Sequence, residues 1–571
     1  MLGSHRKVVA LVFAVGLVAA IGAGCVPKSA TFEGTTSGGA TSEPKKGGTL
    51  SYYLSEAFYI DPYNIQGSED VQVAQALFDS LTDFDPLEPE KLIPAAAESW
   101  ESTASGKIWT FRLDKTGTFA DGTPVKAQDF IYAWNRIAST KTKNTATNEA
   151  DPSVLSGILT PVAGTNAEGN SDKGISGLKA LDDYTLEVTL KYPFGDFEYV
   201  VAHPALAPVP RKHVEGGVEF GGKKVPFGEM PLGNGAFKMS EPWKHDQYIK
   251  VVANGDYYGQ KPYIDGIDFM IFKDPDTAYA EFEAGTLDFT QIGEGRIKEA
   301  ERTYGVSENG YTANPGQQVL LGTENSTYYL VCNLNDELMQ NADLRKAISL
   351  AINREAICDL AFEGTRDPAD NIVPPGIIGY EKGAWEYAKY DVAAAEKALA
   401  DAGFPEGKGA PEIRLTYNND GGHEKTMTLI QSDLATIGVK ATFDAADATA
   451  TWEKYTVGKF QIGRSGWGAD YPVMDSFLSA LFRSAGGSNE SGYGNSATDM
   501  AIDAARAMVD SDARVAAYQD IDRAIGTDVP LIPIMFYKHN NVAANRVHDL
   551  TYSAMALADF NSVWLDAAAG K

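Results

Sequence analysis

The sequence predicts an α/β fold with at least two lobes, and three observations carry this prediction. The chain has 571 residues, which is too long for one hydrophobic core. Residues 411–443 have the pattern of a strand, a helix and a second strand, and the right-handed crossover of such a unit makes its strands parallel. A content of 44% apolar and 11% aromatic residues is typical of a globular protein and not of a disordered one.

The N-terminus has the composition of a secretory signal. A basic segment precedes an uncharged apolar run from Val8 to Ala23, and small residues lead to Cys25. The run is short for a membrane span. This arrangement resembles the lipobox of bacterial lipoproteins, although Gly22 stands where that pattern prefers Leu. The resemblance implies that residues 1–24 are a removed signal peptide and that Cys25 is lipidated. The alternative is an uncleaved anchor on the same side of the membrane.

Residues 25–47 follow as a lipidated cysteine and a flexible tether, because they are rich in Gly, Ser and Thr and lack apolar periodicity. Only Cys332 and Cys358 remain after the tether, which excludes a fold built on disulfides. These two thiols form one bridge or stay buried and free. The net charge of −28 argues against a nucleic acid as partner, since phosphate binding needs a basic patch.

The elements that follow the tether are read from local patterns. Residues 48–54 have a strand pattern, and Asp61-Pro62 is a turn or helix start. The apolar spacing of residues 70–81 predicts an amphipathic helix. Residues 108–113 alternate as a strand, and a turn over 119–125 leads into a further helix. That helix carries on one side Phe130, Ile131, Trp134 and Ile137.

The second half of the chain contains the clearest unit. Residues 413–417 alternate as a strand, and residues 427–437 carry a helical apolar stripe. Gly438 fits the left-handed position that ends a helix, and residues 439–443 form the second strand. Residues 138–177, by contrast, are polar and poorly periodic, which predicts a surface loop.

Two loops are expected at the carboxyl ends of neighbouring strands in this unit. A strand over residues 458–463 is followed by a loop over 464–471, and the other loop runs from Asn418 to His423. Ligands bind outside the carboxyl ends of the strands in open sheets of this kind. The two loops therefore form the candidate binding site.

The loop over 464–471 combines a fixed charge of each sign with an aromatic ring. Gly466 and Gly468 let the backbone approach a ligand closely, and Trp467 offers a flat apolar surface. Arg464 and Asp470 could hold opposite ends of a zwitterion. The alternative is a buried tryptophan flanked by structural ion pairs.

Ten sequence landmarks lie in order along the chain. They are Glu98–Trp100, Trp109–Leu113, Asp121–Pro124, Asp129–Trp134, Pro231–Lys238, Asn254–Gly259, Lys261–Asp265, Asp343–Ile348, Ala351–Arg354 and Val529–Ile534. Together they resemble the large solute-binding proteins of bacterial ABC importers, the peptide/nickel/opine-type family (family 5). One departure is Lys126, where members usually carry a Thr that can cap the following helix. The resemblance implies a periplasmic-binding-protein-like fold of type II, with two α/β lobes joined by a hinge and an additional smaller lobe.

The same resemblance implies how the chain is divided. Lobe I contains residues 48–75, 190–325 and 535–571. The smaller lobe II contains residues 76–189, and lobe III contains residues 326–534.

The resemblance to the oligopeptide-binding branch also implies roles for individual residues. Asp470 receives the α-ammonium of a peptide, whereas His423 and Arg464 receive its carboxylate. The remaining ligand-binding residues would be Tyr417, Asn418, Gly466, Trp467, Gly468 and the segment Gln66, Gly67 and Ser68, which lies alongside the peptide backbone. Gln66 replaces a glutamate of that branch, so the charge at this end is reduced.

The expected protein is therefore a monomeric, extracytoplasmic lipoprotein on the outer face of the cytoplasmic membrane. It captures short peptides and delivers them to an ABC permease and its ATPases. The alternative within the family is an oligosaccharide, a nickel chelate, haem or an opine as cargo. A peptidase is a remote alternative, because hydrolase and zinc motifs are missing and the seven histidines are scattered. We expect no catalysis, no cofactor and no metal.

Overall fold

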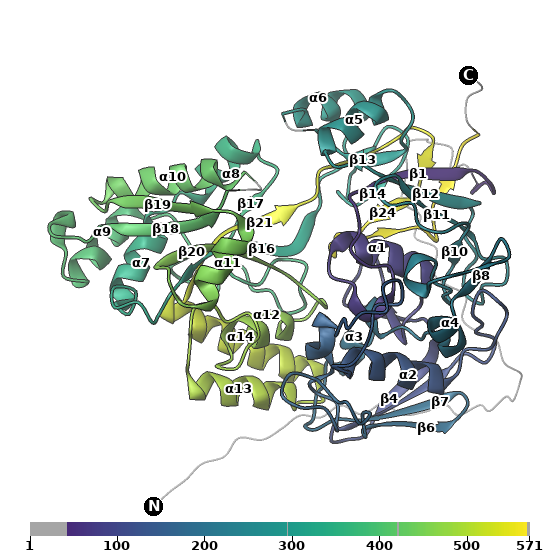
Figure 1. The fold of residues 1–571 in the computed structure, drawn as a ribbon. Helices are drawn as coiled ribbons and strands as arrows, with labels where there is room; N and C mark the ends of the chain where they lie inside the picture. The colour runs from purple at the N-terminus through teal and green to yellow at the C-terminus, as the bar shows by residue number, and fades with distance from the viewer. Residues whose placement is uncertain (1–42, 294, 420–421, 568–571) are drawn as a thin grey trace, which may run out of the picture. The chain divides into compact units, whose positions relative to one another are not determined.

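The computed structural model describes residues 43–293, 295–419 and 422–567. The expected signal peptide, Cys25 and the tether as far as residue 42 lie outside the described residues. Three sheets of four or more strands organise the described chain (Figure 1). Their strand orders are β10-β11-β12-β1-β13-β22-β15, β4-β5-β7-β6 and β17-β21-β16-β20-β18-β19.

The seven-stranded sheet is assembled from distant parts of the sequence. Its strands are β1 (Thr49–Leu54), β10 (Phe237–Met239), β11 (Tyr248–Ala253), β12 (Gly266–Ile271), β13 (Phe289–Gln291), β15 (Val319–Leu320) and β22 (Asn541–Ala543). The expected first strand is thus confirmed as β1, which is parallel to β12 and β13. The helices beside the seven-stranded sheet are α1 (Ser68–Leu77), α5 (Pro275–Glu283) and α6 (Ile297–Tyr304).

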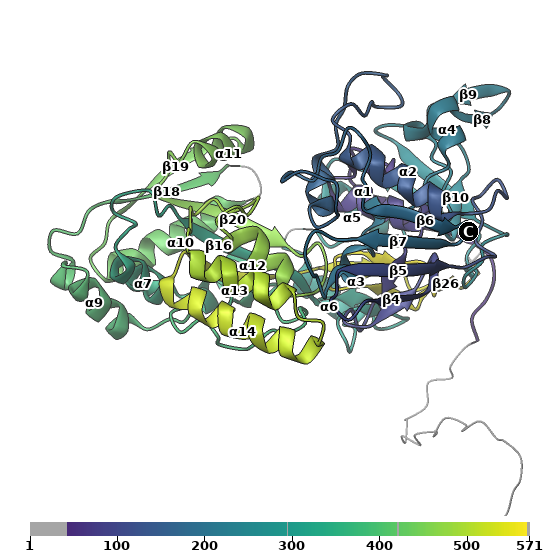
Figure 2. The same cartoon turned by 90° about the horizontal axis from the view of Figure 1, so that it is seen from below.

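The four-stranded sheet is antiparallel and packs on one long helix. It contains β4 (Ala97–Ser102), β5 (Ile108–Leu113), β6 (Leu178–Asp182) and β7 (Thr185–Thr189), and α2 (Ala127–Ala138) packs against β6 and β7 (Figure 2). Trp134 of α2 is fully buried, and its indole N–H donates to the carbonyl of Leu206 at 2.8 Å. The strand and the helix expected here are confirmed. Residues of the four- and seven-stranded sheets share one hydrophobic cluster.

Short elements fill the connections between these sheets. The strands are β2 (Thr82–Phe84), β3 (Leu92–Pro94), β8 (Val218–Phe220), β9 (Lys223–Val225), β14 (Thr312–Ala313), β23 (Val547–His548), β24 (Leu550–Tyr552), β25 (Ala558–Asp559) and β26 (Trp564–Leu565). The helices are α3 (Phe197–Val200), α4 (Arg211–Gly216) and the 3-10 turns η1 (Pro62–Asn64), η2 (Val154–Leu159), η3 (Pro204–Leu206), η4 (Phe227–Glu229) and η5 (Pro405–Gly407). Within the expected loop 138–177, η2 is the regular element among the described residues.

The six-stranded sheet is covered by helices on both faces. Its strands are β16 (Thr323–Cys332), β17 (Asp367–Pro368), β18 (Ile413–Asn418), β19 (Ala441–Ala446), β20 (Ile462–Gly468) and β21 (Leu531–Lys538). One face packs on α7 (Ala342–Ala351), α8 (Arg354–Phe362), α9 (Val392–Asp401) and α10 (His423–Thr436). The other packs on α11 (Ala448–Thr456), α12 (Asp475–Phe482), α13 (Ser496–Arg506) and α14 (Ser511–Asp528).

The unit β18-α10-β19 confirms the strand-helix-strand prediction. β18 is parallel to β19, with Ile413 opposite Ala441. The apolar stripe of α10 is buried, and Gly438 adopts a φ of +77° directly after the helix, a conformation that glycine tolerates best. The second strand starts two residues later than expected, at Ala441.

The prediction for residues 458–471 was wrong in its boundaries. The strand is β20, Ile462–Gly468, and Gly458 lies in a turn with a φ of +67°. The Gly-rich sequence reads as a loop, but β20 pairs antiparallel with β16, with Gly468 opposite Ser326. This pairing supplies the hydrogen bonds that the local pattern does not predict. Arg464 and Trp467 are therefore strand residues.

The helix expected over residues 70–81 is also shorter than its apolar pattern. It is α1, and it ends at Leu77 because the following residues are held by a neighbouring loop. The N–H of Gly235 donates to the carbonyl of Leu77, and the side chain of Asn234 bonds to both backbone groups of Asp79. Leu81 is buried without being helical.

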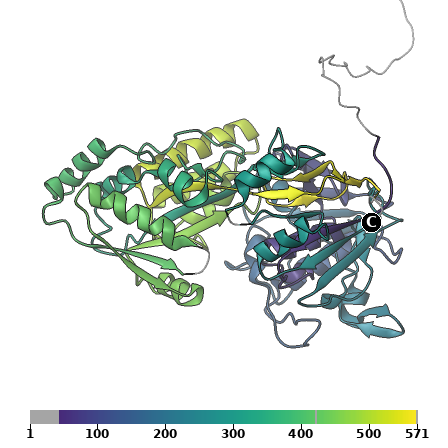
Figure 3. The same ribbon diagram turned by 90° about the horizontal axis from the view of Figure 1, so that it is seen from above.

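Two segments connect the seven-stranded and six-stranded sheets. Residues 321–322 join β15 to β16, and residues 539–540 join β21 to β22; both can be followed in teal and yellow in Figures 1 and 3. The N–H of Gly322 donates to Nε2 of His539 at 2.9 Å, which ties the two segments together. A Cβ on Gly322 would lie 2.3 Å from a ring carbon of Tyr311, so only glycine fits there.

Both cysteines of the described chain are free thiols. Cys332 and Cys358 are buried, and burial raises the pKa of each thiol to about 12. Of the two alternatives, the structure therefore selects unpaired thiols. Throughout the described ranges, the helices are either too short or too polar to cross a bilayer.

Candidate ligand-binding site

Neighbouring strands bring the expected carboxylate-binding residues together. Tyr417 and Asn418 end β18, and Arg464 lies in the adjacent strand β20. Nη1 of Arg464 donates to Oδ1 of Asn418 at 3.4 Å. The ring of Tyr328 lies 4.8 Å from the Arg464 guanidinium and 5.6 Å from the ring of His423, the first residue of α10. One tyrosine therefore lies near both candidate cations.

Arg464 is a half-buried cation without an anionic partner. Its Nη2 donates to the hydroxyl of Tyr537 at 3.1 Å, and its other contacts are also neutral. It forms no ion pair with any carboxylate in the described part of the chain. A partly desolvated charge without a counter-charge is unfavourable. This arrangement suits the binding of an external anion.

Asp470 is the complementary case, a carboxylate without a cation. Its backbone N–H donates to the hydroxyl of Ser476 at 3.0 Å, but among the described residues its carboxylate has neither a hydrogen-bond donor nor an ion-pair partner. Desolvation raises the pKa of this carboxyl to about 6. The side chain is nevertheless exposed, so water reaches the carboxylate although protein atoms surround it at longer range.

The first turn of α12 fixes the segment around Asp470. The indole N–H of Trp467 donates to the carbonyl of Ser476 at 2.9 Å, and the hydroxyl of Tyr471 donates to Asp475 at 3.0 Å. Asp475 is itself fully buried and forms an ion pair with Arg506 at 3.0 Å. Trp467 is thus held by its edge, with its ring only partly buried. The charges beside it are not structural ion pairs.

A pocket of about 320 Å³ lies over Arg464 and the glycines of β20. It is lined by Glu324, Ser326, Trp452, Arg464, Gly466, Trp467, Gly468 and Tyr537. Four of these residues come from the neighbouring strands β16 and β21 and from α11, and sequence motifs do not single them out. The sequence signal for part of this set is alternation along β16: Glu324, Ser326 and Tyr328 are two residues apart, so their side chains share one face of the strand.

The glycines of β20 keep this pocket open. Neither Gly466 nor Gly468 has a positive φ. A Cβ on Gly466 would meet the carbonyl of Thr327 and the hydroxyl of Tyr537 at 3.5 Å, which is ordinary van der Waals contact. Since neither backbone conformation nor packing requires glycine at this position, the missing side chain leaves space for a ligand.

Gly466→Val is therefore expected to weaken ligand binding at least tenfold, because its methyl groups occupy the pocket beside Arg464. The free energy of unfolding should change by less than about 1 kcal/mol, since a β-branched residue suits an unstrained strand position. Calorimetric titration and chemical denaturation measure the two effects. The matched control is Gly487→Val, at an exposed glycine with no neighbour within 4 Å. Unchanged affinity of Gly466→Val contradicts the assignment of the pocket.

The segment Gln66–Ser68 lies beside the seven-stranded sheet, at the start of α1. The N–H groups of Gln66 and Gly67 donate to Oδ2 of Asp70, at 2.7 and 3.4 Å. Asp70 thus holds these two N–H groups at the start of the helix. The segment can offer a ligand its carbonyl groups but not the N–H groups of Gln66 and Gly67. Gln66 and Ser68 are exposed. Within the described chain, no hydrogen bond or ion pair joins this segment to Arg464 or Asp470.

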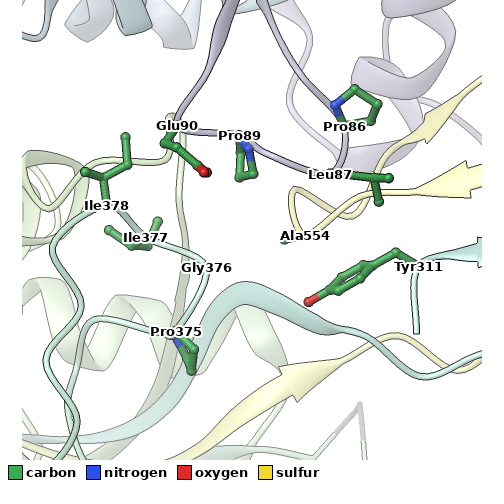
Figure 4. Close-up of a pocket in the computed structure, with 10 residues that line it drawn as sticks. All are labelled: Pro86, Leu87, Pro89, Glu90, Tyr311, Pro375, Gly376, Ile377, Ile378 and Ala554. Carbon is green, nitrogen blue, oxygen red and sulfur yellow. The ribbon is translucent and has the colours of Figure 1, made fainter. Parts of the chain in front are cut away.

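A second pocket, of about 300 Å³, has a different character. Prolines and aliphatic side chains dominate its lining, with Glu90 as its charged residue and Tyr311 at one side (Figure 4). The hydroxyl of Tyr311 donates to the carbonyl of Thr323 and is not free. This pocket lacks the paired charges of the first. It is the weaker candidate for a charged ligand.

Two sheets joined by two connecting segments, with a charged pocket on the six-stranded one, are the architecture expected of an α/β solute-binding protein. The chain belongs to the bacterial extracellular solute-binding proteins, family 5, whose middle-region model matches residues 91–489. This match confirms the family and the type II periplasmic-binding fold that the sequence landmarks predict. Among the described residues, no group of three His, Cys, Asp or Glu side chains could hold a metal ion.

Several named proteins are similar over most of their length. The periplasmic oligopeptide-binding protein OppA of Haemophilus influenzae is 28% identical over 84% of this chain and 86% of its own. A probable deoxycholate-binding periplasmic protein of Escherichia coli K12 is also 28% identical, over 84% of this chain and 85% of its own. The structure of Haemophilus influenzae OppA in complex with the peptide RPPGFSPFR matches with a TM-score of 0.69 and 25% identity, over 92% and 99% of the two chains.

Proposed function

We propose that this protein captures short peptides outside the cytoplasm and delivers them to an ABC importer. The observation that carries the proposal is the pair Arg464 and Asp470: two opposite charges, six residues apart, that have no ionic partners in the described chain. A free peptide presents the two complementary charges at its termini. The similarity to an oligopeptide-binding protein and to the structure of a peptide complex supports the same ligand class.

The proposed site is a clamp for peptide termini. Asp470 receives the α-ammonium, and Arg464 and His423 receive the carboxylate. Gly422, which precedes His423, has no side chain to cap the start of α10, so backbone N–H groups there can assist. Termini and backbone are common to all peptides, so this recognition does not depend on sequence. The separation of the charged groups selects length, at about 3.3–3.6 Å per extended residue.

We propose that the two segments at 321–322 and 539–540 form the hinge between lobes. Lobe I would contain residues 48–75, 190–325 and 535–571, lobe II residues 76–189, and lobe III residues 326–534. The sheet composition supports this division, because each sheet of four or more strands draws its strands mainly from one lobe. Closure over a peptide would give the permease a loaded state that differs from the empty one.

A non-peptide solute is the competing proposal. A bile acid such as deoxycholate has one carboxylate and a large apolar body, so it would satisfy Arg464 but leave Asp470 unpaired. An oligosaccharide would need neither charge, and haem carries carboxylates but no ammonium group. An opine has carboxylates and a protonated amine and would use both charges, so only its mass distinguishes it from a short peptide, whereas a nickel chelate is recognised by its metal content. The unpaired carboxylate of Asp470 therefore favours a ligand that carries an ammonium group.

The remaining parts of the proposal concern location and partners. We place the protein as a monomer on the outer face of the cytoplasmic membrane, tethered through a lipidated Cys25. Its partners would be the permease and ATPase subunits of an importer. It would act as a carrier without catalysis and without a cofactor.

Native mass spectrometry of protein purified without refolding tests the ligand class. We expect added masses that fragment as peptides of a few residues. Added masses that correspond to a sugar, a sterol acid or a metal chelate would overturn the proposal. Incubation with a synthetic peptide provides the second readout, because appearance of cleavage products would restore the peptidase alternative.

A further inference from the structure

Glu324 is a second carboxylate in the pocket of Arg464, and the clamp does not use it. It lies on β16, two residues after Gly322, and is half-buried. Within the described part of the chain, its carboxylate has no hydrogen-bond donor and no ion-pair partner within 4 Å. It lines the pocket of about 320 Å³ together with Arg464. A charge in this position requires an explanation, because burying it without a partner is unfavourable.

The positive charge that acts on the Glu324 carboxyl, Arg366, does not neutralise it. Arg366 influences its carboxyl electrostatically but forms no ion pair with it. Nη1 of Arg366 instead donates to the carbonyls of Thr365 and Lys538, each at 2.7 Å, and its guanidinium lies 5.3 Å from the ring of Tyr537. Desolvation raises the pKa of the Glu324 carboxyl to about 7, and Arg366 opposes this shift. The environment is thus one that a bound cation would stabilise.

The other walls of the pocket also suit a cation. Trp452, Trp467 and Tyr537 contribute aromatic side chains, and Trp452 is 39% exposed although it is a large apolar residue. Aromatic faces attract Lys and Arg side chains, and partial desolvation strengthens the attraction. The aliphatic stem of such a side chain would pack on the rings while its charged end meets a carboxylate.

We propose that Glu324 and these rings form a subsite for a basic side chain at the carboxyl-terminal residue of the peptide. Arg464 would hold the carboxylate of that residue, and Glu324 would hold the charged end of its side chain in the same pocket. The inference rests on the proposed peptide function. It extends that function by naming the side chain, Lys or Arg, that the pocket prefers.

Calorimetric titration of ligand-depleted protein with Ala-Ala-Lys and Ala-Ala-norleucine tests the subsite. The two peptides differ only in the ammonium group at nearly equal side-chain length. At pH 8 we expect the wild-type protein to bind the lysine peptide at least tenfold more tightly. Glu324→Gln should reduce this preference to less than twofold while affinity for the norleucine peptide stays within twofold. Lys-Ala-Ala, which has the charge at the wrong end, should show no preference that depends on Glu324.

Two comparisons separate the subsite from other causes. The matched control is Glu490→Gln, because Glu490 is a half-buried carboxyl whose pKa desolvation also raises to about 7, but it does not line this pocket. It should leave the lysine preference intact. A preference that is absent in the wild type, or that persists in Glu324→Gln, overturns the subsite. If neither peptide nor trialanine binds at all, the proposed peptide function itself fails.

Discussion

Replacing Asp470 with alanine weakens binding of short peptides by about 3–5 kcal/mol, on the order of a hundred- to several-thousandfold in Kd. The reason is that closure of the lobes would desolvate the peptide ammonium, which then lacks its counter-charge. Calorimetric titration with trialanine at pH 7 measures the change. Unchanged affinity would rule out Asp470 as the ammonium site.

An N-acetylated peptide supplies the control for this prediction. It lacks the ammonium group, so its weak binding should be the same in the wild type and in Asp470→Ala.

The thermal stability of the ligand-free protein provides a second check, through the variant Asp470→Asn. The raised pKa of about 6 means that this carboxyl favours folding at low pH and that this contribution is lost as the pH rises through 6. Asp470→Asn should therefore raise the Tm at pH 7 but not at pH 4.

Arg136→Met is expected to lower the free energy of unfolding by about 3–5 kcal/mol, because it leaves a buried carboxylate without its partner. Nη1 and Nη2 of Arg136 bond to the two carboxylate oxygens of Asp61, at 3.0 and 2.8 Å, and the two side chains are only 9% and 2% exposed. The guanidinium also lies 4.7 Å from the ring of Tyr63. Chemical denaturation measures the loss.

Two variants show whether burial is the cause. Arg211→Met breaks an exposed pair with Glu215 of similar length, 2.8 Å, and should cost far less than Arg136→Met, because solvent screens an exposed pair. The double variant Asp61→Leu with Arg136→Met should recover much of the stability, because no buried charge is left unpaired. Since Asp61 and Tyr63 lie five and three residues before Gln66, any folded Arg136→Met should also bind peptide more weakly. A loss as small as that of Arg211→Met contradicts this account.

The fold could be predicted best where local pattern and tertiary environment agree. The unit β18-α10-β19 follows from alternation, a helical stripe and Gly438, because each face is buried as its pattern requires. β20 could not be delimited, since the Arg-Ser-Gly-Trp-Gly sequence has no strand pattern of its own. It is a strand because β16, more than a hundred residues earlier, pairs with it from Ser326 to Cys332.

The candidate site shows the same limit. The sequence placed Arg464, Asn418 and His423 near one another because they follow or end neighbouring strands. Glu324, Trp452 and Tyr537 were missed, because they reach the pocket from β16, α11 and β21 through pairing that only the folded chain reveals. The family resemblance implied that Gln66, Gly67 and Ser68 lie alongside the peptide backbone, but it did not reveal that Asp70 already binds the N–H groups of Gln66 and Gly67.

The two connecting segments between the sheets have a mechanical consequence. Glu324 lies two residues from Gly322, and Tyr537 lies two residues from His539, so strands β16 and β21 form part of the pocket wall and lead directly into the proposed hinge. A solute that contacts these side chains is only a few ångströms along the backbone from the connecting segments, because adjacent strand residues are about 3.3 Å apart. Binding of a solute in the pocket can therefore act on the proposed hinge through the backbone of β16 and β21. It does not require a chain of side-chain contacts through the core.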